Sequence, residues 1–317
     1  MNAITLPRSV ALTDALLSGV GAPLGPGDLQ QIEEGIERRL RALGAAAGGQ
    51  PTTGHRGPGG RPGPSGRPAR RLCLDGYLVR TGRRPGESSA ATGAATGSAG
   101  ARFAWSAANA RRSIGLAAVR ACLDDPEATP SVGVDRALRA AQRPAAAPPG
   151  SLGRWLATLG PGALAVTRAE AVRWSTALHG ALDWARLGPS TQVGGADRSW
   201  ASRDRAGVVI RGRAEVRAPV APGPGDPGGL AALVVLSGWP GPGARCELAV
   251  NALAQALGAQ RADQVPSRIA GWWPQSGRSL ILDVDRALLE AAAQAVLGAA
   301  ATLLGVAGSE VPLPDGS

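Results

Sequence analysis

The sequence has no lysine and very few aromatic side chains other than tryptophan. All 34 of its cationic side chains are arginine, and it has one Tyr and one Phe beside eight Trp. A guanidinium group stays protonated at physiological pH, so no arginine can act as a general base. Mechanisms that need a lysine are therefore excluded for this chain.

Cysteine and histidine are also scarce. Cys73, Cys122 and Cys246 are odd in number, far apart and without metal-ligand spacing. We expect reduced, mostly buried thiols, as in a cytosolic protein. The two histidines are His55, in a Gly/Pro-rich stretch, and His179. A Ser/His/Asp triad is therefore not supported.

Long apolar runs are missing as well. Charges precede the Ala-rich segment near residue 300 and Gln294 interrupts it, so no run reaches the roughly 18 residues of a membrane span. The beginning of the sequence lacks a basic stretch followed by an apolar one, which a signal peptide would show. We expect a cytoplasmic protein with no membrane partner.

The net charge is +10, and much of it comes from residues 51–90, where eight arginines face two acidic residues. Such a cluster can bind a phosphate backbone by releasing counterions. However, Ala, Gly, Pro and Arg dominate the whole sequence, as in the product of a GC-rich coding sequence. The arginine excess therefore leaves open both a DNA-binding role and a coding bias, and the arginine-rich segment could equally be solvated disorder.

Low-complexity segments divide the chain. Gly, Pro and Ser/Thr-rich stretches are typical of linkers, and changes in hydrophobic period mark the ordered parts. The predicted parts are a helical segment (1–44), a disordered Gly/Pro/Arg-rich linker (45–70), a strand and helix region (71–150) with a low-complexity insert (88–100), an α/β core (151–307) and a flexible tail (308–317).

Hydrophobic periodicity and capping residues predict the elements. Asp28 can cap a helix that Gly44 would end, and Thr167 and Glu170 form a capping box. After Gly188 the period shifts toward two, which is typical of strands. Helices are predicted at 28–43, 105–123, 167–186, 246–257 and 285–304, and strands at 72–80, 207–216, 230–236, 268–273 and 279–284. This order favours an α/β fold whose sheet is covered by helices.

Four short motifs follow one another in residues 165–305. They are His179-Gly180-Ala181-Leu182, Gly212-Arg213-Ala214-Glu215, Leu233 to Gly238 and Glu247 to Leu253. In this order they resemble the PD-(D/E)XK nuclease superfamily and its RecB-like branch. The resemblance implies a restriction-endonuclease-like core, in which helices flank a small central mixed sheet.

The chain departs from that superfamily at two positions. Such nucleases hold Mg²⁺ with carboxylates from adjacent strands, and a lysine orients the nucleophile or neutralises charge. Here Val235 stands at the second acidic position and Ser237 at the lysine position. Glu215 is the one carboxylate that remains, and a single carboxylate binds a hard divalent cation poorly. We therefore expect no cofactor, and Mg²⁺ only if the site is active.

The resemblance gives several residues vestigial roles. Glu215, Glu247 and Arg245 are the candidate catalytic residues, and His179 and Glu215 are the candidate metal ligands. His179 also fits an ordinary core or boundary residue. Glu215, flanked by arginines in the sequence, also fits an alternating solvent-facing charge.

Four residues are candidates for nucleic-acid contact. Arg213 and Arg217 could bind phosphates, and Trp272 and Trp273 could stack on bases. A tryptophan pair on a strand also fits one core residue and one edge-packing residue.

Three functions are open at this point. The leading hypothesis is a non-catalytic PD-(D/E)XK-like protein, a pseudonuclease that acts as a binding or scaffold module in DNA metabolism, with DNA or a protein as its partner. The second is an active, divergent metal-dependent DNA nuclease. The third is a protein-interaction module with no nucleic-acid role.

Overall fold

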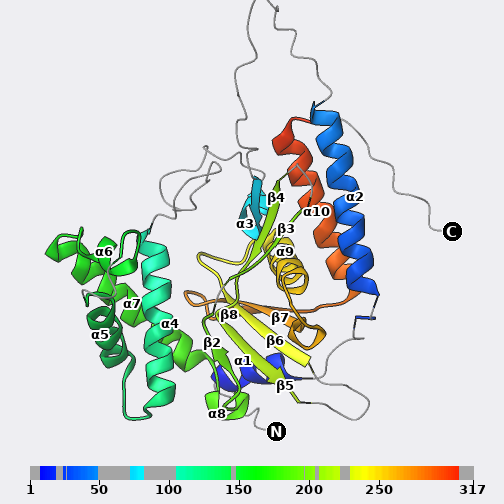
Figure 1. Cartoon of the computed structure of the whole chain (residues 1–317). Coiled ribbons are helices and arrows are strands. Elements are labelled where there is room, and N and C mark those ends of the chain that lie inside the picture. The colour runs from blue at the N-terminus through cyan, green and yellow to red at the C-terminus, as the bar shows by residue number, and fades with distance from the viewer. Residues whose placement is uncertain are drawn as a thin grey trace, which may run out of the picture.

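The computed structural model describes residues 8–18, 24–25, 27–48, 72–81, 105–143, 148–195, 197–203, 207–221 and 229–306. The linker expected at 45–70 lies outside these residues from 49 onward, and so do the insert at 88–100 and the tail at 308–317. Figure 1 shows an α/β core and, beside it, a separate unit made of helices.

Two small mixed sheets form the centre of the α/β core (Figure 1). The larger sheet has the order β2 (Gln192–Val193), β5 (Val216–Val220), β6 (Gly229–Val235), β7 (Pro266–Trp273) and β8 (Arg278–Asp283). The smaller one has the order β1 (Leu72–Asp75), β4 (Val208–Gly212) and β3 (Arg198–Ala201). β6 is parallel to β7, because helix α9 (Ala244–Leu257) lies in the connection between them. β1 is parallel to β4, and the other pairs are antiparallel.

The apolar run of β6 is explained by burial on both faces of the sheet. Side chains alternate along a strand, so neighbouring residues face opposite sides. Ala232 and Val234 pack into one hydrophobic core, and Leu233 and Val235 pack into a second one on the other face. A strand covered on both sides needs no polar alternation.

The first core lies between the sheets and three helices. These are α2 (Asp28–Gly48), α9 and α10 (Arg286–Leu304), and the short α3 (Gly76–Thr81) packs on α9. The Asp285 carboxylate accepts a hydrogen bond from the Leu288 N–H at 2.7 Å and so caps α10. By length and composition α10 could also cross a membrane. Its apolar face, with Leu289 and Val296, belongs to the protein core.

The second core joins the sheet to the helical unit. It contains α1 (Arg8–Leu17), α8 (Trp184–Leu187), and residues of α4 (Ala107–Asp124) and α7 (Pro161–Ala181). A third core holds α4 and α7 together with α5 (Pro130–Ala141) and α6 (Leu152–Leu156). The helix α4 thus packs on its own bundle and on the sheet, because Ile114 and Leu116 enter different cores.

The predicted α/β class, with small mixed sheets and flanking helices, is confirmed, and most predicted elements are found. Four details of the predicted elements were wrong. Thr167 lies buried in the middle of α7, where its hydroxyl donates to the Ala163 carbonyl at 2.9 Å, so it does not cap the helix. The helix α2 continues past Gly44. The predicted strand 72–80 ends at Asp75 and turns into α3, and the segment predicted as one strand from 207 to 216 divides into β4 and β5.

Helix α9 packs closely against Gly212, the last residue of β4. A Cβ atom added at Gly212 would lie 2.7 Å from the Ala254 Cβ and 2.9 Å from the Asn251 carbonyl oxygen. Such contacts force the backbone to shift, which typically costs about 1–3 kcal/mol.

We expect Gly212→Ala to lower the free energy of unfolding by that amount in urea titration. Gly298→Ala is the control, because it adds a Cβ to the exposed face of α10 with no atom within 4 Å. The control should gain roughly 0.5–1 kcal/mol, and equal effects of the two substitutions would contradict this packing.

Candidate functional site

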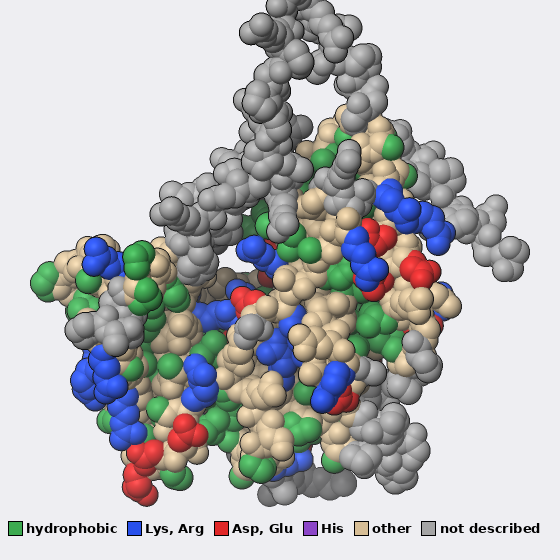
Figure 2. All heavy atoms as spheres, viewed as in Figure 1, with side chains coloured by type: hydrophobic (Ala, Val, Ile, Leu, Met, Phe, Trp, Pro, Cys, Tyr) green, Lys and Arg blue, Asp and Glu red, His purple; other side chains and the backbone are tan. Residues whose placement is uncertain are grey.

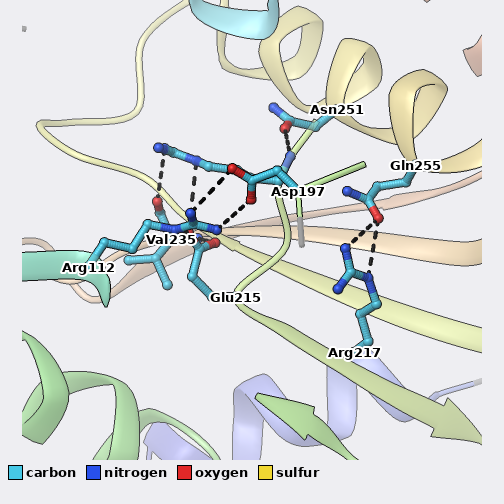
Figure 3. A network of polar contacts seen from close by, with 8 residues as sticks. Arg112, Asp197, Glu215, Arg217, Val235, Asn251 and Gln255 are labelled. Atoms are coloured by element: carbon cyan, nitrogen blue, oxygen red, sulfur yellow. Dashed lines mark hydrogen bonds and ion pairs between the residues drawn. The ribbon is translucent and has the colours of Figure 1, made fainter. Parts of the chain in front are cut away.

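Glu215 lies at the break between β4 and β5, and its side chain is buried with 0% exposure. The backbone there still pairs with its neighbours, since the Glu215 N–H donates to the Leu233 carbonyl at 2.8 Å. The carboxylate turns toward β6, and its Oε2 accepts a hydrogen bond from the Val235 N–H at 2.7 Å (Figure 3). The sequence-based alternative of a solvent-facing charge was therefore wrong.

The cation that pairs with Glu215 is Arg112, which reaches it from α4 in the helical unit. The Arg112 Nε donates to Glu215 Oε1 at 2.6 Å, and its Nη2 donates to Asp197 Oδ1 at 2.9 Å (Figure 3). Burial disfavours the charged guanidinium, but Glu215 and then Asp197 outweigh it and raise the pKa of Arg112 above its ordinary value. One guanidinium therefore bridges two carboxylates.

Arg213 is a second arginine near the same carboxylate. Its Nε is 3.9 Å from Glu215 Oε1, and its Nη2 donates to the Val235 carbonyl at 3.1 Å. The Arg213 N–H donates to Asn251 Oδ1 on α9 at 3.0 Å. The side chain is 39% exposed, so Arg213 connects the buried carboxylate to the surface.

Glu247 and Arg245 lie in the first turn of α9. Glu247 forms a salt bridge with Arg80 at 3.1 Å and its side chain is 15% exposed, whereas Arg245 is exposed. Burial raises the pKa of Glu247, while Arg80 and Arg213 lower it in part. The carboxylate of Glu247 is thus paired with Arg80, and no described contact joins it directly to Glu215.

His179 lies near the C-terminal end of α7. Its ring stacks on Trp184, with 6.2 Å between the ring centroids, and the Trp184 Nε1 donates to the His179 carbonyl at 2.7 Å. In the described part of the chain, no hydrogen bond or ion pair joins His179 to Glu215. The structure therefore places this histidine in a packing role at the end of the helix.

The predicted nucleic-acid contacts are mostly inside the protein. Trp272 is 7% exposed and Trp273 is 3% exposed, and they lie in the second and first core, so neither ring presents a stacking face. Arg217 is 5% exposed and donates to Gln255 Oε1 at 2.9 Å. Of the four candidates, Arg213 alone reaches the surface.

The groups around Glu215 do not fit a magnesium site. Mg²⁺ is usually bound by one or two carboxylates together with water and substrate phosphates, so the carboxylates must be free to bind it. Here both Glu215 oxygens accept protein hydrogen bonds, and Asp197 is paired with Arg112. Val235 and Ser237 supply no carboxylate. Within the described residues, no group of three or more His, Cys, Asp or Glu side chains is placed to hold a metal ion.

The sequence did not point to three residues of this region. Arg112 and Asp197 lie 103 and 18 positions before Glu215 along the chain and belong to no motif. Trp239 is 71% exposed in the connection between β6 and α9. A tryptophan flanked by Gly238 and Pro240 directly after a strand was an available signal for an exposed loop residue.

Comparison with known proteins gives no family for the chain. No protein-family model matches it, and neither a curated protein nor a solved structure matches it.

The contribution of the Arg112–Glu215 ion pair to the stability of the protein can be tested by substitution. Removing one partner of a buried ion pair typically costs about 3–5 kcal/mol, because the other charge remains buried without compensation. We expect Arg112→Met to lower the free energy of unfolding by that amount. Arg136→Met is the matched control, since Arg136 is exposed and pairs with Asp125; it should cost at most about 1 kcal/mol. The double variant Arg112→Met, Glu215→Gln should recover part of the loss, and equal costs for the two single variants would contradict this account.

The raised pKa of Glu247 predicts a dependence on pH. The folded protein binds the proton of the Glu247 carboxyl more tightly than the unfolded chain does, so ionisation of Glu247 destabilises the folded state. This loss of stability develops as the pH rises from the ordinary pKa of the carboxyl to its raised pKa in the folded protein. Glu247→Gln cannot ionise. Its stability relative to the native protein should therefore increase from acidic to neutral pH, measured by urea unfolding at each pH. Glu34→Gln, at an exposed position of α2, supplies the baseline. A relative stability of Glu247→Gln that falls toward neutral pH would refute the assignment.

Proposed function

We propose that the chain is a non-catalytic nucleic-acid-binding module built on a restriction-endonuclease-like core. The order β5, β6, α9, β7 and the placement of Glu215 beside β6 support this core. Trp239, an indole 71% exposed at the carboxyl end of β6, is the observation that carries the binding function. Trp239 lies in the loop that follows β6, the strand that would carry part of the reaction site if the resemblance holds.

Arginines surround the loop that carries Trp239. Arg213 donates to the carbonyl of Val235, the last residue of β6, at 3.1 Å. Arg80 packs over Gly243, because a Cβ atom added there would meet the Arg80 Cγ at 2.3 Å. Arg245 is exposed on the first turn of α9. Figure 2 shows basic side chains gathered in the middle of this face, where the helical unit meets the α/β core.

An exposed indole beside arginines suits single-stranded nucleic acid. Every base has a flat π-face that can stack on an aromatic ring, and arginines follow the phosphate backbone without reading sequence. The loop extends from the sheet toward the helical unit (Figure 1), so a strand lying along it would meet both parts of the protein. We therefore infer sequence-tolerant binding of single strands.

The neutralised carboxylate favours binding over cleavage. Metal-dependent cleavage needs an anionic site that concentrates Mg²⁺ beside the phosphate. At Glu215 the protein's own guanidiniums supply the positive charge, and they leave a surface that attracts phosphate. The same arginines that disfavour a metal site therefore support the proposed binding role.

The test is fluorescence anisotropy with a labelled oligothymidine at several salt concentrations. Base stacking on one aromatic side chain contributes about 1–3 kcal/mol, so Trp239→Ala should weaken binding by roughly 5- to 150-fold. Arg245→Gln should reduce the slope of log affinity against log salt by about one. Val166→Ala is the control, because Val166 is 59% exposed on α7, away from the loop.

Two results would overturn the proposal. One is an absence of binding at low salt, where electrostatic association is strongest, and it would leave the protein-interaction role. The other is equal affinity of the native protein and Trp239→Ala, which would move any binding away from this loop.

A further inference from the structure

A second cluster of arginines lies deeper, between β5, β3 and α9. Arg217 is 5% exposed and donates through Nε at 3.3 Å and Nη2 at 2.9 Å to the Oε1 of Gln255 (Figure 3). Among the described residues, no carboxylate lies within 4 Å of its guanidinium. A buried guanidinium thus has a neutral amide where buried arginines ordinarily have an acid.

Arg198 adds a second uncompensated charge. Its Nη1 donates to the carbonyl oxygens of Gln255 at 3.0 Å and Gln264 at 2.6 Å, both of them neutral acceptors. Burial, and then Arg198, lower the pKa of Arg217, and burial lowers the pKa of Arg198. Both shifts have the sign expected where positive charge is crowded and desolvated.

The acids nearest to this cluster are already in use. Asp197 and Glu215 both pair with Arg112. Among the described residues, neither Arg198 nor Arg217 forms an ion pair with a carboxylate, and the hydrogen-bond acceptors of both are neutral. These two guanidiniums therefore carry positive charge that no described ion pair compensates.

Gln255 supplies an unused donor at the same place. The residue is 1% exposed, and its Nε2 has no hydrogen-bond partner among the residues that the structure describes. Figure 3 shows this nitrogen on the opposite side of the amide from the oxygen that accepts from Arg217. A buried amide N–H without an acceptor costs free energy, so such groups are normally paired.

The turn before β3 offers a way in from the surface. Gly195 is exposed and has φ +140°, and a Cβ atom added to it would lie 3.1 Å from the Arg217 Nη1. The end of the guanidinium therefore lies directly under a glycine backbone with no side chain to cover it. A backbone without a side chain is the thinnest cover that the chain can place over a buried guanidinium.

We propose that Arg217 and Gln255, with Arg198 beside them, form a binding site for a small oxyanion of the phosphate class. The anion accepts hydrogen bonds from Arg217 and from the orphaned Gln255 Nε2 and compensates the excess charge. Phosphate suits the planar guanidinium because it can accept paired hydrogen bonds. The site is separate from the Trp239 loop and independent of nucleic-acid binding.

The experiment is thermal unfolding of the full chain with increasing sodium phosphate, against sodium chloride at matched ionic strength. A ligand that binds the folded state raises Tm in a saturable way. We expect phosphate to raise the Tm of the native protein by a few degrees more than chloride does. A response that follows ionic strength alone would contradict the proposal.

Gln255→Glu is the decisive variant. It places a carboxylate where Gln255 Oε1 now accepts from Arg217, and so supplies the missing negative charge within the protein. Its Tm without phosphate should exceed that of the native protein, and its phosphate response should disappear. A lower Tm with the phosphate response intact would overturn the site. Arg217→Met should also lose the response; because it can fail to fold, Gln255→Glu carries the test.

Two further measurements distinguish this site from the Trp239 loop and identify the kind of anion that it binds. Trp239→Ala should keep the full phosphate response, since its side chain belongs to the other site; loss of the response there would refute a separate anion site. Glycerol phosphate then distinguishes the sources of the anion. Stabilisation at lower concentrations of the ester than of inorganic phosphate supports a phosphate monoester as ligand, and the reverse order supports the free anion.

Discussion

The ion pair between Arg112 and Glu215 determines both how the protein is assembled and what its candidate site can do. It joins the helical unit to the break between β4 and β5, at a carboxylate with no exposed surface. Desolvating two charges is costly, and the attraction offsets this only when the geometry is close and the remaining lone pairs are satisfied. The Val235 N–H and Asp197 meet that condition here.

The two-sided burial of the sheet explains why charge is concentrated at this point. Covering β6 on both faces leaves its ends as the places where polar groups can approach it. Glu215 and Arg213 meet the end of β6, Trp239 lies in the connection to α9, and Arg245 lies in the first turn of that helix. The same constraint brings Arg217 under α9, where Gln255 meets it in place of an acid. Both proposed sites follow from the way helices cover this sheet.

Local patterns in the sequence were sufficient for much of the fold. Periodicity and caps predicted α2, α4, α9, α10 and the β7–β8 hairpin. The pair Thr129-Pro130, an N-cap residue followed by proline at the first helical position, is a typical start signal for α5. The site was less predictable. The motif located Glu215, but its partner Arg112 is 103 residues away and depends on how α4 packs on the sheet. The burial of both Trp272 and Trp273 likewise required knowledge that β7 is covered on both faces.

The central claim is that Glu215 is neutralised by the protein and does not serve metal-dependent cleavage. The most direct measurement incubates the protein with linear single- and double-stranded DNA and Mg²⁺ or Mn²⁺, and follows product formation by gel electrophoresis. The account predicts that the native protein and Glu215→Gln leave the DNA equally intact. Divalent-metal-dependent cleavage by the native protein that disappears in folded Glu215→Gln would contradict it.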